Sequence, residues 1–113
     1  MAGKKTLIKS REDVEKRIKS FIEELKKEII VDKVILYGSW ADGHPDEFSD
    51  IDLAVFSPDF GESRLNELQM LSKVAWEVDK AIEAVPYPSS RLKNVEASSF
   101  VSKIIETGEV VYD

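Results

Sequence analysis

The sequence contains no cysteine and only one histidine, His44, among its 113 residues. Disulfide bonds and thiolate-ligated metal sites are therefore excluded, and a zinc site of the usual His/Cys kind is not expected. Any bound metal would have to be held by carboxylates, which favour a hard cation such as magnesium.

Basic residues are outnumbered, since 16 Lys and Arg stand against 22 Asp and Glu for a net charge of −6. They are spread among the acidic residues, so a broad basic surface for nucleic-acid phosphates is not expected. No apolar run is long enough to span a membrane, and the first nine residues carry three lysines without an apolar core, unlike a signal peptide. We therefore expect a cytoplasmic protein that does not bind nucleic acid directly.

The length and a hydrophobic content of 42% suit a single packed domain spanning residues 1–113, with 1–9 as a loose N-terminal segment. Apolar residues recur at helical spacing in three stretches, and short apolar runs bounded by Gly, Pro and polar residues predict strands between them. The order predicts an α/β or α+β domain with a small mixed β-sheet flanked by helices. The expected helices are a five-turn helix capped by Ser10, a turn at 39–41, a helix starting at Glu62 or Ser63, and 95–106. The expected strands are 31–37, 50–56, 80–85 (stopped by Pro86 and Pro88) and 110–112, and 42–49 is a loop that holds His44.

Two aspartates, Asp50 and Asp52, stand two positions apart in the second expected strand. Alternate side chains of a strand share a face, so both carboxylates point one way while Ile51 and Leu53 point to the core. Like charges in such proximity repel by up to about 4 kcal/mol at an effective dielectric near 20, and a divalent cation turns this cost into a gain. The pair is a candidate metal site, although two solvated acids on an exposed face would give the same pattern.

The first expected strand ends at Gly38-Ser39 and turns into a helical start. Backbone N–H groups at such a turn bind phosphate, glycine permits close approach, and serine adds a hydroxyl donor. Anion-binding groups thus end one strand while metal ligands lie on the next, which suits a metal–nucleoside triphosphate complex. The alternative for Ser39 is a simple helix N-cap, and Trp40 is expected to pack beneath the loop.

Gly38-Ser39, ten intervening residues and Asp50-Ile51-Asp52 together resemble the signature of the polymerase-beta-like nucleotidyltransferases, and the string GSWADG…SDIDLAV resembles the minimal nucleotidyltransferases in particular. The resemblance implies that family's fold and a magnesium-dependent enzyme that moves a nucleoside monophosphate, AMP from ATP, onto a hydroxyl. It implies that Asp50 and Asp52 hold two magnesium ions and that Gly38 and Ser39 hold the triphosphate. A third carboxylate, which would bind the metals and deprotonate the acceptor, matches Glu83, where the family more often has aspartate.

Free-standing domains of this family are often antitoxins of a small all-helical HEPN-type toxin, so the resemblance also implies a helical protein partner that is bound or adenylylated. The alternatives are a non-catalytic nucleotide-binding subunit and a toxin-binding interaction protein. For Glu83 the alternatives are an edge-strand charge that discourages aggregation, or replacement by Asp79 as the third acid. The exposed flank of a small sheet also suggests a homo-oligomer. The acceptor and the identity of the nucleotide do not follow from the residues.

Overall fold

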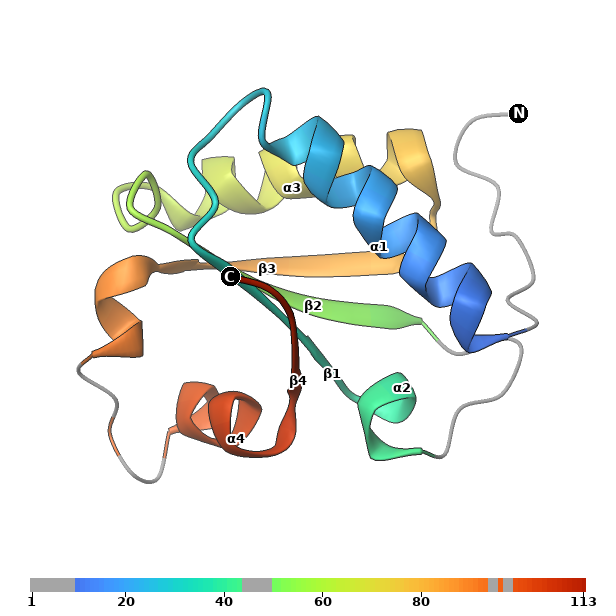
Figure 1. Ribbon diagram of the computed structural model, residues 1–113. Coiled ribbons are helices and arrows are strands. Elements are labelled where there is room, and N and C mark those ends of the chain that lie inside the picture. The colour runs from blue at the N-terminus through green and yellow to red at the C-terminus, as the bar shows by residue number, and fades with distance from the viewer. Residues whose placement is uncertain (1–9, 44–49, 94–95, 97–98) are drawn as a thin grey trace.

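The computed structural model describes residues 10–43, 50–93, 96 and 99–113. These residues form a four-stranded sheet in the order β3-β2-β1-β4 with helices on both of its faces (Figure 1). The strands are β1 (Lys33–Tyr37), β2 (Ile51–Ser57), β3 (Ile82–Pro88) and β4 (Glu109–Tyr112). The helices are α1 (Arg11–Leu25), α2 (Ser39–Asp42), α3 (Arg64–Val78), the 3₁₀ turn η1 (Ser89–Leu92) and α4 (Phe100–Thr107). The segment 1–9, the start of the 95–106 helix and the loop position of His44 lie outside the described residues.

The sheet is mixed, as the sequence predicts. Strand β1 pairs antiparallel with both β2 and β4, whereas β2 and β3 run parallel and are joined through α3. The C-terminal end of β1 therefore meets the N-terminal ends of β2 and β3 at one end of the sheet. At this end Asp52 is opposite Tyr37 on one side and opposite Glu83 on the other.

Two apolar layers enclose the sheet. Helices α1 and α3 cover one face, and α4 with η1 covers the other (Figure 1). Both faces of β2 are buried, because Ile51, Leu53 and Val55 enter the larger core while Ala54 and Phe56 enter the smaller one. Each large apolar side chain removed from water contributes roughly 1.5–3 kcal/mol, so β2 is firmly anchored and carries Asp52 on a well-packed strand.

Helix α1 begins where the sequence predicts. The Ser10 hydroxyl accepts a hydrogen bond from the Asp13 N–H at 3.2 Å, which satisfies one of the N–H groups at the helix start. The helix ends earlier than predicted, at Leu25, because the Lys27 N–H turns back to the Glu24 carbonyl and tightens the chain. Ile29 lies beyond the helix and still packs against the larger core.

Strand β3 extends through both prolines that were expected to end it. It pairs only with β2 in the described sheet, and the Pro86 carbonyl accepts a hydrogen bond from Arg64 Nη1 at 2.9 Å on the opposite side. The N–H and C=O of one strand residue point the same way, so the N–H that proline lacks would face outward. An edge strand therefore tolerates both residues. Helix α3 starts at Arg64, shortly after the predicted Glu62 or Ser63, and its second residue, Leu65, is 67% exposed.

None of the helices in the described part of the chain combines the length and the apolarity that a membrane span requires.

Candidate active site

Four of the residues singled out by the sequence lie at the end of the sheet where β1, β2 and β3 meet. Gly38 directly follows β1, Asp50 directly precedes β2, and Asp52 and Glu83 are each the second residue of their strand. Residues paired across neighbouring strands project to the same face, so Asp52, Glu83 and Tyr37 share the face that α4 covers farther along. Asp50 and Asp52 are partly buried, whereas Glu83 is exposed.

Gly38 has a backbone conformation that is open to glycine alone, with φ 78° and ψ −153°. A Cβ atom at this position would lie 2.3 Å from Asp52 Oδ2 and 3.3 Å from Asp52 Cγ. The Asp52 carboxylate therefore sits directly against the backbone of the glycine turn. The candidate metal ligand and the candidate phosphate-binding turn are one contiguous structure.

Helix α2 is a single turn that starts at this glycine. The Gly38 carbonyl accepts hydrogen bonds from the N–H groups of Ala41 at 3.0 Å and Asp42 at 2.9 Å. The N-cap is Gly38, with no side-chain cap, and Ser39 is the first helical residue. The simple N-cap interpretation of Ser39 is therefore wrong, because the cap position falls one residue earlier. Trp40, which was expected to pack beneath the loop, packs against the larger core.

Asp50, Asp52 and Glu83 interact electrostatically. Burial raises the pKa of the half-buried Asp52 carboxyl to about 6, and the negative charges of Glu83 and then Asp50 act in the same direction. Ionising this group in the metal-free protein is therefore costly. A cation placed among the three carboxylates would remove that cost.

Tyr37 belongs to the same site, although the sequence pattern marks it only as the last residue of a strand. Burial raises its pKa to about 12, with added contributions from Asp52, Tyr87 and Glu83. Its ring meets that of Phe100 edge to face at 5.9 Å and an interplanar angle of 85°. The phenol stays protonated at neutral pH and remains a hydrogen-bond donor near the carboxylates. Its position opposite Asp52 in an antiparallel pair is the signal that could have identified it.

The donor set suits a hard cation, because it consists of carboxylate oxygens. In the segments that the structure describes, no three His, Cys, Asp or Glu side chains already stand in the arrangement of a metal site. Glu83 is exposed, so its side chain can rotate toward Asp52 without disturbing the core. The residues present therefore fit magnesium, which Asp50, Asp52 and Glu83 would hold together once their side chains adjust.

Asp79, the fallback for the third acid, has a different place. It is 6% exposed at the C-terminus of α3, its Oδ1 accepts the Ala81 N–H at 2.8 Å, and its Oδ2 lies 3.1 Å from Arg17 Nε. The carboxylate thus joins α3 to α1 through a buried ion pair. The fallback assignment is wrong, because Asp79 is committed to these structural contacts.

We expect Asp79→Ala to lower the free energy of unfolding by about 3 kcal/mol, since the substitution removes the buried carboxylate that pairs with the largely buried Arg17 guanidinium. Urea denaturation measures the change. Glu12→Ala is the matched control, because its pair with Lys16 joins side chains that are 79% and 74% exposed and should cost less than about 0.5 kcal/mol. If Asp79→Ala kept full stability but lost activity, Asp79 would again be a candidate for the third acid of the site.

Known proteins match the chain in sequence pattern and in fold. The family model described as polymerase beta, nucleotidyltransferase matches residues 16–113. No curated protein sequence matches the chain significantly. A candidate nucleotidyltransferase from Sulfolobus solfataricus superimposes with a TM-score of 0.60 at 20% identity, covering 71% of each chain.

Two toxin–antitoxin structures share the fold as well. One, with AMP-PNP, gives a TM-score of 0.55 at 23% identity over 87% of this chain and 72% of the other. The other, MntA-HepT, gives 0.50 at 21% identity over 90% and 72%. The family model spans most of the chain, including every residue placed at the candidate site. The chain therefore belongs to the polymerase beta nucleotidyltransferase family.

Proposed function

We propose that this domain transfers AMP from ATP to a hydroxyl group, with two magnesium ions, in the cytoplasm. The observation that carries the proposal is the position of Asp52. Its carboxylate lies against the Gly38 backbone and stands in register between Tyr37 and Glu83. A triphosphate on the glycine turn would therefore meet ligands for its cation on the adjacent strand.

In this proposal Asp50 and Asp52 hold the cations, and Gly38 and Ser39 hold the triphosphate. Bound magnesium would neutralise charge on the triphosphate and on the departing pyrophosphate. Glu83 accepts the proton of the acceptor hydroxyl as the new bond to the α-phosphorus forms. The bond between the α-phosphorus and the bridging oxygen breaks at the same time, and pyrophosphate carries away the electron pair.

We infer that the acceptor is a tyrosine on a small helical HEPN-type protein. Two structures that share the fold are toxin–antitoxin assemblies, and one of them contains AMP-PNP. The net charge of −6 disfavours a nucleic-acid acceptor. The two outer strands of the sheet, β3 and β4, would support self-association as a further part of the proposal.

The exposed position of Glu83 favours one second candidate, a domain that binds nucleotide and partner without turnover. The two candidates differ in whether ATP is consumed. The same exposed position also fits the edge-strand charge considered from the sequence.

The test is incubation of the protein with magnesium, ATP labelled at the α-phosphate and a small all-helical HEPN-type protein, followed by mass spectrometry of the labelled residue. We expect Glu83→Gln to lower the transfer rate by about 100-fold or more, which is the size of a general-base contribution, with nucleotide affinity changed less than about twofold. Full activity of Glu83→Gln would remove Glu83 from the mechanism. Intact ATP after long incubation with the wild-type protein would favour the non-catalytic candidate.

A further inference from the structure

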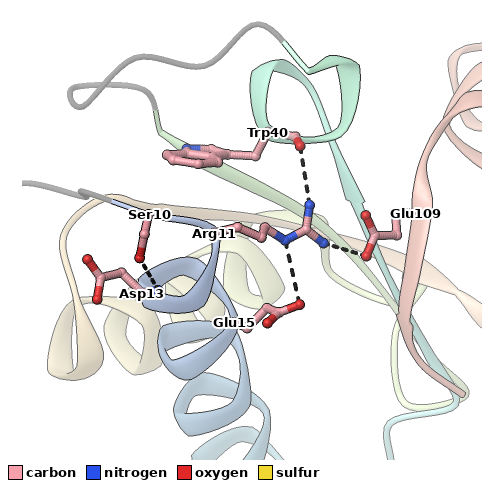
Figure 2. A network of polar contacts seen from close by, with 6 residues as sticks. All are labelled: Ser10, Arg11, Asp13, Glu15, Trp40 and Glu109. Atoms are coloured by element: carbon pink, nitrogen blue, oxygen red, sulfur yellow. Dashed lines mark hydrogen bonds and ion pairs between the residues drawn. The ribbon is translucent and has the colours of Figure 1, made fainter.

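The first residue of α1 reaches two elements that are distant in sequence. Arg11 Nη1 donates to the Trp40 carbonyl of α2 at 3.5 Å, and Arg11 Nη2 donates to Glu109 Oε2 of β4 (Figure 2). Its Nε lies 3.7 Å from Glu15 Oε1, one turn along α1. One guanidinium therefore links α1, α2 and β4 at the side of the sheet that carries the glycine turn.

Helix α2 needs support from outside itself. It has only four residues, and its N-cap glycine offers no side-chain hydrogen bond. Few backbone carbonyls of so short a helix can accept a hydrogen bond from an N–H group of the same helix. Its external supports include Trp40 and Ala41, which pack against the larger core, and Arg11, which donates to the Trp40 carbonyl. The helix that begins at Ser39 is thus held on its core side and through the carbonyl of Trp40.

Arginine is suited to this position for a geometric reason. Its planar fork offers donors in fixed directions, so it can bind a carboxylate and a carbonyl together, which a lysine ammonium on a flexible stem does less well. Glu109 and Glu15 both favour the charged guanidinium and hold it in place. The Arg11 side chain is 38% exposed, so water can reach it, but its contacts with α1, α2 and β4 fix its position.

We propose that Arg11 is a positioning residue for nucleotide binding: through the Trp40 carbonyl it fixes the glycine turn at Gly38-Ser39. The proposal rests on the nucleotide-binding function proposed above. Arg11 lies outside residues 16–113, the part that matches the family model, so the family signature does not include it. Arg11 touches neither substrate nor cation, and it acts through α2.

The test is the dissociation constant of magnesium AMP-PNP, measured by calorimetry on fully folded protein. We expect Arg11→Met to weaken binding about tenfold, the size of one lost charged hydrogen bond, and Arg11→Lys to restore part of the loss. In a double-mutant cycle the effect of Arg11→Met shrinks in a Ser39→Ala background, because the turn that Arg11 supports has already lost a phosphate contact. Hydrogen exchange of the α2 amides quickens in Arg11→Met without any nucleotide.

Lys16→Met is the matched control, since Lys16 lies on the same helix with a side chain that is 74% exposed, and it should leave the affinity unchanged. If the wild-type protein binds AMP-PNP and Arg11→Met binds it equally well, the positioning role is overturned. Additive losses in the double-mutant cycle overturn it too, because they indicate a general loss of stability. A wild-type protein that does not bind AMP-PNP contradicts the proposed function itself, a different result.

Discussion

Asp52→Asn is expected to abolish nucleotidyl transfer while raising the stability of the metal-free protein. The activity should fall by about a thousandfold or more, because a metal ligand that stabilises transition-state charge contributes several kcal/mol. The free energy of unfolding should rise by about 1 kcal/mol at pH 7, after allowance for the solvent that screens a half-exposed group. The loss of activity and the gain of stability have one cause: the Asp52 carboxylate is charged at pH 7 in a half-buried position that disfavours its charge.

The pH dependence gives the stability change a definite sign. The pKa of Asp52 is raised from 3.8 in a solvated chain to about 6 in the folded protein. The folded protein binds this proton more tightly than the unfolded chain does. Protonated Asp52 therefore stabilises the fold below pH 3.8, and this stabilisation is lost as the pH rises through about 6. The asparagine side chain cannot ionise, so the variant and the wild type should be equally stable near pH 4, and the variant should be the more stable at pH 7.

Urea denaturation of the metal-free proteins at both pH values measures this difference. The control is Glu77→Gln, an exposed acid on α3 whose neutralisation should change neither stability nor activity appreciably. An Asp52→Asn variant that is less stable than the wild type at pH 7 would contradict the electrostatic account. One that retains activity would remove Asp52 from the metal site.

Gly38→Ala has the second large effect. An alanine here must adopt a backbone conformation reserved for glycine, which costs about 1–3 kcal/mol, and its Cβ would collide with the Asp52 carboxylate, 2.3 Å away. We expect a total loss of about 3 kcal/mol in stability and at least a 100-fold loss of nucleotide affinity. Thermal denaturation and AMP-PNP binding measure the two effects.

Gly43→Ala separates the backbone cost from the collision. Gly43 also has a positive φ, 82°, but a Cβ there would meet no described residue within 4 Å, so about 1 kcal/mol is expected. The double variant Gly38→Ala with Asp52→Ala should recover part of the stability, because the Asp52 Cβ lies at an ordinary contact distance of 3.5 Å. Equal losses in both glycine variants would show that the close approach of Asp52 is unimportant.

Much of this arrangement can be predicted from local sequence. The apolar run before Gly38 and the one after Asp50 each predict a buried strand, and the structure has β1 and β2 there. The alternation of Asp50, Ile51, Asp52 and Leu53 predicts which side chains enter the core, and Ile51 and Leu53 are fully buried. Such features depend on strand geometry alone, so they need no knowledge of neighbouring elements.

Features that depend on strand order cannot be obtained this way. Pro86 looks like a strand terminator until β3 is known to be an outer strand, and Asp79 looks like a free acid until α1 places Arg17 beside it. Tyr37 and Arg11 become functional candidates only when the register and the packing of α1 are known. The sheet register places Glu83 opposite Asp52 of β2, whereas the catalytic role of Glu83 stays a prediction.

Strand register also determines which parts of this protein can change without loss of chemistry. Asp52 is held between Tyr37 and Glu83 by hydrogen-bonded pairing and by the burial of both faces of β2. The pairing of the strands sets that geometry, and connections between elements generally tolerate insertion and substitution better than the elements they join. Evolution or an engineer could therefore alter the connections between strands while the carboxylates stay in place.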